Sequence, residues 1–456
     1  MSDTIAATAT APGEAGIGVI RISGPEAAEI MNKVFVPASG KPVENRHMTY
    51  GSIRDGNSGQ ELDEALCVLM RGPESYTGED IVEVHCHGGM MPLRQTLELI
   101  LSRGCRLAEP GEFTKRAFLN GKMDLMQAEA VADLISAKAH TSYRAAEDQL
   151  AGKLSKPVRA LRDDLTDILV DLTVNIDYPD EDIEELTYNK LADGLEAAIG
   201  KTKKLLDGAD TGRIIREGLR VAIVGKPNVG KSSMLNRLLR ENRAIVTDIP
   251  GTTRDTIEEH ADIRGIPMNF IDTAGIRKTN DSIEKIGIDR SNAAIERADA
   301  VILIIDGSTP LTDDDRKLMR NYKPGKTILV INKTDLPMLT DKNELAALLP
   351  DAEIIKTSMK EEDGLVPVED ALEKLVYMGK NIEPGSMIVT NARHKSLLEA
   401  CLSSLNSALR ATGDRIPHEL VEIDVNAAYM SLGKILGDEA ENDIINQVFA
   451  RFCLGK

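Results

Sequence analysis

An eight-residue glycine-rich segment places the strongest constraint on this sequence. Residues 225–232 read GKPNVGKS and match the pattern G-x-x-x-x-G-K-[ST]. An apolar, β-type run over 221–224 precedes the segment, and a helical pattern over 233–239 follows it. In this context the backbone N–H groups of the loop and the first turn of the helix form a cradle for phosphates. The segment therefore predicts an α/β domain that binds a nucleotide.

The polar residues that close this segment have separate expected roles. Lys231 is expected to reach the β- and γ-phosphates, and Ser232 is expected to ligate Mg²⁺. A chance glycine-rich turn is the alternative interpretation. The strand before the segment and the helix after it argue against that alternative.

Two further segments carry candidate magnesium and γ-phosphate contacts. Residues 272–275 (DTAG) end an apolar run, so we expect Asp272 to hold Mg²⁺ through a water and Gly275 to sense the γ-phosphate. Thr253, within 251–255 (GTTRD), is a candidate second Mg²⁺ ligand on a mobile switch.

Residues 332–335 (NKTD) follow the apolar run 328–331 and indicate which base is bound. The Asp335 carboxylate can accept hydrogen bonds from the ring N–H and the exocyclic amine of guanine, which adenine does not offer in that arrangement. Asn332 and Lys333 are expected to buttress the base. A last base contact is expected near Ser358, through the backbone only, because Met359 departs from the common Ser-Ala-Lys pattern.

The sequence does not decide which groups promote hydrolysis. Many small GTPases place Gln directly after the DTAG motif, but Ile276 stands there and cannot orient water. The segment 281–285 (DSIEK) offers carboxylates, and a solvated acidic loop is the plainer interpretation. A cation near the β–γ bridge could be a monovalent ion held by Asn228, or it could be Arg254.

A change of pattern along the 456 residues indicates about three domains. We predict an N-terminal α+β domain, a helical domain, and a Ras-like G domain with a parallel sheet inserted into the helical domain, because helical patterns flank the α/β rhythm on both sides. In the first domain we expect strands over 19–22, 65–70 and 81–85 and a helix over 91–101. Pro157 is expected to kink or restart the helical pattern of 150–172. The predicted boundaries are 1–120 for the N-terminal domain, 218–378 for the G domain, and 121–217 with 379–456 for the two segments of the helical domain.

Composition excludes several other classes of protein. A net charge of −18 argues against a protein that grips nucleic acid through overall positive charge. Five cysteines, without a C-x-x-C pair, indicate reduced thiols rather than disulfides or structural zinc. No basic-then-apolar leader and no run of about 18 apolar residues occur, so we expect a cytoplasmic protein without a membrane partner.

Stretches outside these motifs resemble the MnmE (TrmE) family of bacterial tRNA-modification GTPases. The resemblance covers essentially the whole chain, and general GTPases lack its N-terminal and C-terminal stretches. The stretches are 21–24 (RISG), 76–80 (YTGED), 87–89 (HGG), 110–113 (PGEF), 116–120 (RAFLN), 251–255 (GTTRD) and 452–456 (FCLGK).

This resemblance implies a reaction and partners. Members of the family form homodimers through the N-terminal domain and work with MnmG, an FAD- and NADH-using protein, in a heterotetramer. Together they add a carboxymethylaminomethyl or aminomethyl group to C5 of the wobble uridine of certain tRNAs. A 5-formyl- or methylene-tetrahydrofolate is the implied one-carbon donor. The acidic net charge leads us to expect that much of the tRNA contact comes from the partner protein.

The resemblance also implies roles for particular residues. Glu284 would orient the attacking water, and K⁺ would be held by Asn228, Thr247, Ile249 and Thr252. The folate would be bound by Arg21, Glu83, Lys122 and Lys456, and Cys453 would be a functional thiol, with a small buried thiol as the alternative. The motifs and the resemblance together assign to GTP the residues Asn228, Val229, Gly230, Lys231, Ser232, Ser233, Thr247, Asp248, Ile249, Pro250, Gly251, Thr252, Thr253, Asp272, Thr273, Ala274, Gly275, Asn332, Lys333, Asp335 and Ser358.

Two other functions share the nucleotide motifs. A ribosome-assembly GTPase would use hydrolysis only to time its release, and it would lack the N-terminal stretches and the terminal cysteine motif. A pure conformational switch without chemistry of its own would not bind a reduced folate.

Overall fold

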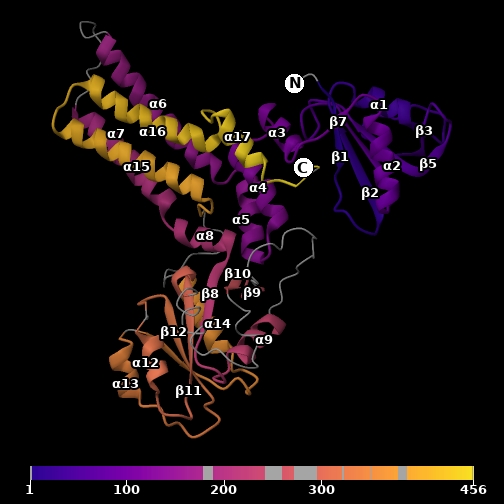
Figure 1. Ribbon diagram of the computed structural model, residues 1–456. Coiled ribbons are helices and arrows are strands. Elements are labelled where there is room, and N and C mark those ends of the chain that lie inside the picture. The colour runs from indigo at the N-terminus through magenta and orange to yellow at the C-terminus, as the bar shows by residue number, and fades with distance from the viewer. Residues whose placement is uncertain are drawn as a thin grey trace. The chain divides into compact units, whose positions relative to one another are not determined.

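The computed structural model describes residues 3–177, 188–241, 259–271, 295–320, 323–350, 352–377, 388–453 and 455. The chain forms two compact units (Figure 1). The first unit comprises Met1–Ala132, Gln149–Thr166 and Tyr429–Lys456, and the second comprises Asp133–Asp148 and Asp167–Ala428. No helix among these described residues is long and apolar enough to cross a bilayer.

A seven-stranded sheet organises the first unit. Its strand order is β3-β4-β5-β6-β2-β1-β7, and every neighbouring pair is antiparallel except β1 with β7. The strands are β1 (Ile5–Thr8), β2 (Ala15–Ser23), β3 (Phe35–Pro37), β4 (Thr49–Arg54), β5 (Glu61–Met70), β6 (Ile81–Gly88) and β7 (Arg106–Leu107).

Helices α1 (Ala27–Val34) and α2 (Met90–Leu101) cover one face of this sheet. Alternate residues such as Ile20 and Ile22 of β2 and Val84 of β6 pack with them in one buried cluster. Because side chains alternate along a strand, the intervening residues of β2 and β6 lie on the opposite face. That opposite face carries the polar residues described below.

The remainder of the first unit is helical. It contains α3 (Glu112–Leu119), most of α4 (Leu125–Ser136), the first half of α6 (Ser155–Asp177), the end of α16 (His418–Leu436) and α17 (Asn442–Phe449). The rings of Phe118, Phe449 and Phe452 gather in one cluster, which packs α17 and the residues after it against α3 and α4.

A six-stranded sheet organises the second unit, with the order β13-β12-β11-β8-β10-β9. The first five strands are parallel, and β9 runs antiparallel to β10 at the edge. The strands are β8 (Leu219–Val224), β9 (Glu259–Ile263), β10 (Ile266–Ile271), β11 (Ala300–Asp306), β12 (Thr327–Asn332) and β13 (Glu353–Lys356).

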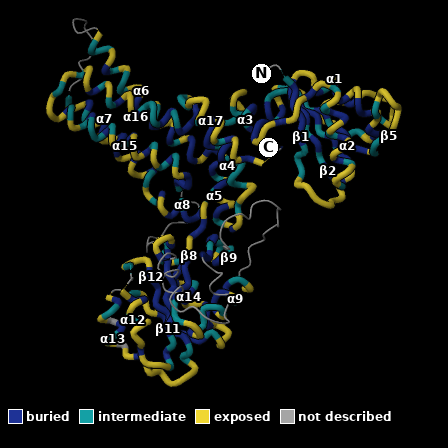
Figure 2. The backbone as a smooth tube through the Cα atoms, viewed as in Figure 1, coloured by how far each residue is buried: buried dark blue, intermediate teal, exposed yellow. Residues whose placement is uncertain are grey.

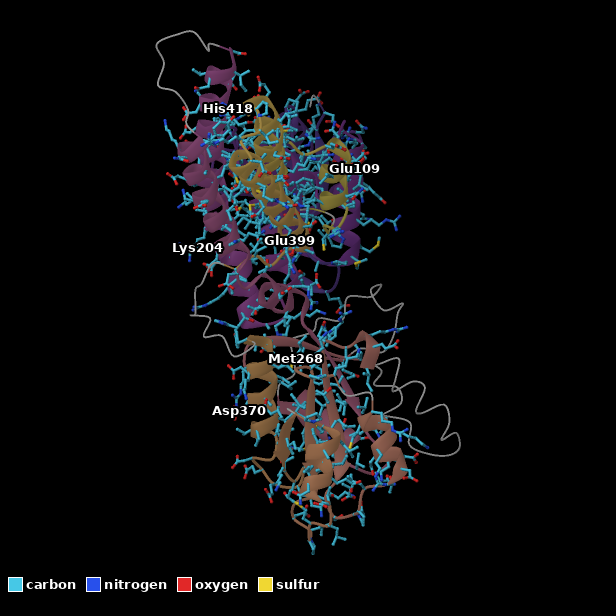
Figure 3. All side chains as sticks on the ribbon, turned by 90° about the vertical axis from the view of Figure 1, so that its left-hand side faces the viewer. Glu109, Lys204, Met268, Asp370, Glu399 and His418 are labelled. Atoms are coloured by element: carbon cyan, nitrogen blue, oxygen red, sulfur yellow. The ribbon has the colours of Figure 1, made fainter. Side chains whose placement is uncertain are left out.

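Helices cover both faces of this second sheet. Helices α9 (Lys231–Glu241) and α14 (Val366–Tyr377) pack on one face, in a cluster that includes the fully buried Met268 of β10 (Figure 3). Helices α12 (Asp313–Met319) and α13 (Lys342–Leu348) pack on the other face. The central strands β11 and β12 of this sheet are accordingly almost entirely buried (Figure 2).

The second unit also contains helices outside the sheet layers. Among them, α7 (Tyr188–Leu206) and α15 (Ala392–Gly413) pack against each other, with Leu195 and Leu405 fully buried. The others are α5 (His140–Leu150), α8 (Ala209–Glu217), the second half of α6 and most of α16.

The predicted fold class is confirmed, with one difference in the second sheet. The strands expected over 19–22, 65–70 and 81–85 and the helix over 91–101 are present as β2, β5, β6 and α2. Pro157 lies in the first turn of α6. The N–H that proline lacks would have no partner within the helix at this position, so a new helix begins here, as predicted, and Pro157 does not interrupt it. The antiparallel edge strand β9 was not predicted. The domain boundaries at 120, 217 and 378 stay predictions.

Candidate functional site

Four loops of the second unit meet at one edge of its sheet. They follow β8, β11, β12 and β13, and these strands are neighbours and parallel. The carboxyl ends of parallel strands face the same edge, which is where open α/β sheets bind ligands. The predicted phosphate loop follows β8 and the predicted base-reading residues follow β12, so the fold brings them together.

The phosphate loop is fixed from the base-reading side. Nδ2 of Asn332 donates to the carbonyl oxygen of Val229 at 2.7 Å, and Asn332 is 3% exposed. A Cβ on Gly230 would overlap with this same Nδ2, so the close approach of the two segments requires glycine. Asn228 has a φ of 62°, the left-handed region that Asn tolerates better than most residues. Ser232 and Ser233 lie in the first turn of α9.

The Lys231 ammonium lies inside the loop that it is expected to serve. It donates to the carbonyl oxygens of Gly225 at 2.7 Å and of Lys226 at 2.6 Å. Burial lowers the pKa of Lys231, because an ammonium loses hydration there. A phosphate group would supply the negative charge that this half-buried ammonium lacks.

Asp335 is held as a hydrogen-bond acceptor at the base-reading position. Oγ of Ser358 donates to its Oδ1 at 2.8 Å, and Nζ of Lys360 donates to its Oδ2 at 3.0 Å. The hydrogen bond from Ser358 has the largest effect on Asp335 and lowers its pKa, and the hydrogen bond from Lys360 lowers it further. The carboxyl therefore stays ionised near neutral pH. The Ser358 hydroxyl is fully buried and orients Asp335, a side-chain role that the sequence did not indicate.

Lys333 is tied to a carboxylate that the sequence did not single out. Its backbone is left-handed, with a φ of 67°, and its Nζ lies 2.6 Å from Oδ2 of Asp306. Asp306 ends β11 and also accepts hydrogen bonds from the backbone N–H and the hydroxyl of Ser308. This pair links the loops after β11 and β12. The only available sequence signal was an acidic residue that ends an apolar strand.

The other predicted nucleotide, magnesium and potassium residues lie outside the described residues. They are Thr247, Asp248, Ile249, Pro250, Gly251, Thr252, Thr253, Arg254, Asp272, Thr273, Ala274, Gly275 and Glu284.

A second candidate site lies on the face of the first sheet opposite α1 and α2. Arg21 of β2 and Glu83 of β6 are directly opposite in the register, and their side chains form an ion pair at 2.8 Å with about one-fifth of each exposed. The Arg21 guanidinium also lies 5.7 Å from the ring centre of Tyr76 and 5.8 Å from that of Phe113. Two aromatic rings thus flank a partly buried ion pair.

Lys122 belongs to the same neighbourhood. Its Nζ donates to the carbonyl oxygen of Pro73 at 3.0 Å, and its side chain lies beside Gly78. It is therefore attached to the loop that carries Tyr76. The structure thus links Lys122 to the loop whose Tyr76 approaches Arg21, and it adds Tyr76 and Phe113, whose approach to Arg21 has no local signal in the sequence.

The C-terminal segment reaches the first sheet. Gly455 packs so closely against the carbonyl of Thr8 that a Cβ would overlap with it, and Thr8 follows Ala7, the β1 partner of Arg21. Lys456 itself lies outside the described residues. Cys453 is exposed, so the alternative of a buried thiol at this position is wrong. Burial raises the pKa of the other thiols, to about 12 for Cys67, which makes them poor nucleophiles.

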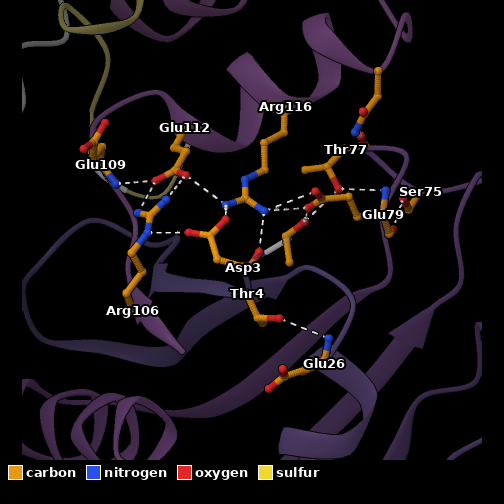
Figure 4. A network of polar contacts seen from close by, with 12 residues as sticks. Asp3, Thr4, Glu26, Ser75, Thr77, Glu79, Arg106, Glu109, Glu112 and Arg116 are labelled. Carbon is orange, nitrogen blue, oxygen red and sulfur yellow. Dashed lines mark hydrogen bonds and ion pairs between the residues drawn. The ribbon is translucent and has the colours of Figure 1, made fainter. Parts of the chain in front are cut away.

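A buried ionic network lies in the same unit (Figure 4). The guanidinium of Arg116, only 1% exposed, pairs with Glu112 at 3.0 Å, with Glu79 at 3.1 Å and with Asp3 at 3.0 Å. Arg106 also binds Glu112 through two hydrogen bonds. The network joins three segments: the residues before β1, the loop before β6, and helix α3. Helix α3 also carries Phe113.

Comparison with known proteins gives full-length matches. Residues 4–122 match a family described as GTP-binding protein TrmE N-terminus, and residues 125–453 match the MnmE helical domain. The chain is similar to proteins named tRNA modification GTPase MnmE. It is 50% identical to that of Alkaliphilus metalliredigens (strain QYMF), 49% to that of Alkaliphilus oremlandii (strain OhILAs) and 47% to that of Clostridioides difficile (strain 630), with 100% of both chains covered each time.

Solved structures also match a portion of the chain. Among them is the G domain of the T. maritima FeoB iron transporter, which is 24% identical, with 34% of this chain and 98% of that chain covered and a TM-score of 0.25.

Proposed function

The chain belongs to the MnmE family of tRNA modification GTPases, and on this premise we propose that it hydrolyses GTP as one component of an enzyme that modifies wobble uridine. The group added would be carboxymethylaminomethyl or aminomethyl, on C5 of the base. The observation that carries the proposal is the link from Asn332 to the phosphate loop, because one buried amide fixes the phosphate-binding and base-reading segments together.

Nucleotide selection follows from the residues at this edge of the sheet. The ionised carboxylate of Asp335 presents two oxygens that Ser358 and Lys360 hold in position. Guanine offers two adjacent N–H donors to such a group, and adenine does not. The ammonium of Lys231 and the loop N–H groups suit the phosphates.

The proposed metal sites use oxygen donors, which suit hard cations. Ser232, at the start of α9, would ligate Mg²⁺ together with Thr253, with Asp272 acting through a water. Asn228, whose left-handed backbone shapes the loop, would hold K⁺ together with Thr247, Ile249 and Thr252. Bound Mg²⁺ and K⁺ would offset the negative charge that develops during phosphoryl transfer.

We predict that Glu284→Ala slows single-turnover GTP hydrolysis in KCl by roughly 10²-fold, because a carboxylate that orients water is lost. Exchange of KCl for NaCl is expected to slow the unmodified protein as well. Asp281→Ala, in the same acidic segment, is the matched control and should keep the normal rate. An unchanged rate in Glu284→Ala would remove this residue from the mechanism.

The face of the first sheet opposite α1 and α2 suits a reduced folate. Arg21 and Lys122 supply cations for carboxylates, Glu83 can accept from the donors of a pterin, and the partly exposed Tyr76 offers a flat surface. The Gly455 contact with Thr8 supports a contribution from Lys456. We therefore propose this face as the site of a 5-formyl- or methylene-tetrahydrofolate.

We expect Arg21→Met to weaken binding of 5-formyltetrahydrofolate by about 30-fold or more, because one charged partner of the ligand is lost and Glu83 loses its guanidinium partner. Ultraviolet difference spectra measure this affinity. Arg54→Met, which removes an exposed ion pair with Glu61 in the same sheet, should bind as the unmodified protein does. Equal folate binding by the two variants would contradict the proposed site.

The proposed assembly follows the family. We propose a homodimer that joins the FAD-binding MnmG in a heterotetramer and acts on tRNA. With a net charge of −18, the isolated chain should bind tRNA more weakly than the assembled complex does. Filter binding of labelled tRNA to both would test this, and equal affinities would contradict it.

One experiment separates this function from a ribosome-assembly GTPase. Nucleoside mass spectrometry of tRNA from a strain that lacks the gene is expected to show unmodified or partly modified wobble uridines. A plasmid copy of the gene should restore them. Normal wobble uridines in the deletion strain would overturn the tRNA-modification proposal and favour the ribosome-assembly alternative.

A further inference from the structure

An almost fully buried carboxylate lies next to the phosphate loop. Asp315, at the start of α12, is 4% exposed. Its Oδ2 accepts from the backbone N–H and the hydroxyl of Thr312, both at 2.9 Å. Its Oδ1 has no hydrogen-bond partner among the described residues. A buried carboxylate with so few donors requires a nearby positive charge.

Lys226, the second residue of the phosphate loop, supplies that charge. Its Nζ lies 2.7 Å from Oδ2 of Asp315 and 2.8 Å from Oγ1 of Thr312. The contact joins the beginning of the loop to the first turn of α12. It is the counterpart of the Asn332 contact, which holds the far end of the loop at Val229.

The same residue also holds the phosphate-binding ammonium. The carbonyl oxygen of Lys226 accepts from Nζ of Lys231 at 2.6 Å. One residue is thus bound through its side chain to α12 and through its backbone to Lys231. A displacement of Lys226 would therefore displace an acceptor that sets the position of Lys231.

The loop needs such external contacts because its backbone is costly. Asn228 adopts a left-handed conformation, which is unfavourable for residues other than glycine even though asparagine tolerates it better than most. Such conformations persist where the surrounding structure over-determines them. Contacts at both ends of the loop meet that requirement.

We propose that Lys226 is a positioning residue of the nucleotide site, which acts through its ion pair with Asp315 to hold the phosphate loop and Lys231 ready for phosphates. This inference rests on the proposed GTPase function and deepens it. Because the pair lies on the phosphate side, its loss should weaken GDP and GTP alike. The preference for guanine over adenine, set at Asp335, should not change.

The test is titration of the full chain with a fluorescent GDP analogue, followed by competition with GTP and ATP. Lys226→Met is expected to bind GDP and GTP about tenfold more weakly. Lys226→Arg, which keeps the charge, should restore affinity to within about threefold of the unmodified protein. Lys317→Met is the matched control, because it removes a Lys–Asp pair from the same helix that does not reach the loop.

A second variant guards against a failure to fold. Asp315→Asn removes the charge of the partner, and the same tenfold loss is expected. The double variant should bind no more weakly than either single variant, because both changes remove one interaction. Thermal unfolding of each variant shows whether it is folded at the titration temperature.

Each outcome bears on a distinct claim. The role of Lys226 is overturned if Lys226→Met or Asp315→Asn binds GDP as tightly as Lys317→Met does. It is also overturned if Lys226→Arg fails to restore the affinity for GDP. If the unmodified protein binds no guanosine nucleotide, the proposed function fails instead.

Discussion

Asp335→Asn is expected to weaken GDP binding by about 10³-fold, the largest effect of any single substitution in the nucleotide site. The carboxylate accepts hydrogen bonds through both oxygens, and Ser358 and Lys360 already fix its orientation. An asparagine would present an amide N–H₂ where guanine needs an acceptor, so a donor of the base would lose its partner. A base with a carbonyl in place of the exocyclic amine, xanthine, should regain some of the lost affinity, since the amide can donate to it.

The matched control for this prediction is Asp341→Asn. Asp341 caps α13 by accepting from the backbone N–H of Asn343, on an exposed surface after the same strand. The substitution is chemically identical and should leave the GDP affinity unchanged. Competition titrations with guanosine and xanthosine diphosphates measure both variants. A GDP affinity for Asp335→Asn within a few-fold of the control would show that Asp335 does not read the base.

Arg116→Met is expected to lower the local free energy of unfolding of the N-terminal sheet by about 3–5 kcal/mol, because Glu112, Glu79 and Asp3 all lose the buried cation that they share. The Arg116 guanidinium is 1% exposed, and its partner Glu112 is 5% exposed. Hydrogen exchange of the β2 and β6 amides in the full chain measures this local stability. Arg94→Met, which removes an exposed pair with Glu98, should change it little.

The same network predicts a dependence on pH. Burial alone would raise the pKa of Glu112, but hydrogen bonds from Arg106, Glu109 and Arg116 outweigh burial and lower it. A carboxyl whose folded pKa lies below its unfolded value stabilises the fold at pH above the unfolded value, 4.5. This contribution is lost as the pH falls through the folded pKa.

If Arg116→Met were as stable as Arg94→Met at neutral pH, the network would not hold the domain together.

The second sheet could be predicted well from the sequence because its signals are local. The central parallel strands β8, β11 and β12 are largely buried and read as apolar runs, and the phosphate and base-reading motifs follow such runs directly. Strand β9 was missed because it lies at the edge, where Glu259, His260 and Asp262 break the apolar pattern. A strand at the edge of a sheet does not need apolar side chains where it meets solvent, so it lacks the apolar run that marks a central strand.

The candidate sites were only partly predictable because their contacts join distant segments. Motif residues such as Lys231 and Asp335 have fixed spacings, and the sequence identified them. Asp315 is 89 residues from Lys226, and nothing around Lys226 indicates that partner. The approach of Tyr76 to Arg21 likewise depends on the packing of a loop against a sheet.

The most direct test of the account is a competition measurement on the unmodified full chain. A fluorescent GDP analogue is bound with Mg²⁺ present, and it is then displaced by GTP or by ATP. GTP is expected to displace the analogue at a concentration roughly 10³-fold or more below that required of ATP, because the Asp335 carboxylate pairs with guanine alone. Equal displacement by the two nucleotides, or no binding of the analogue, would contradict this expectation.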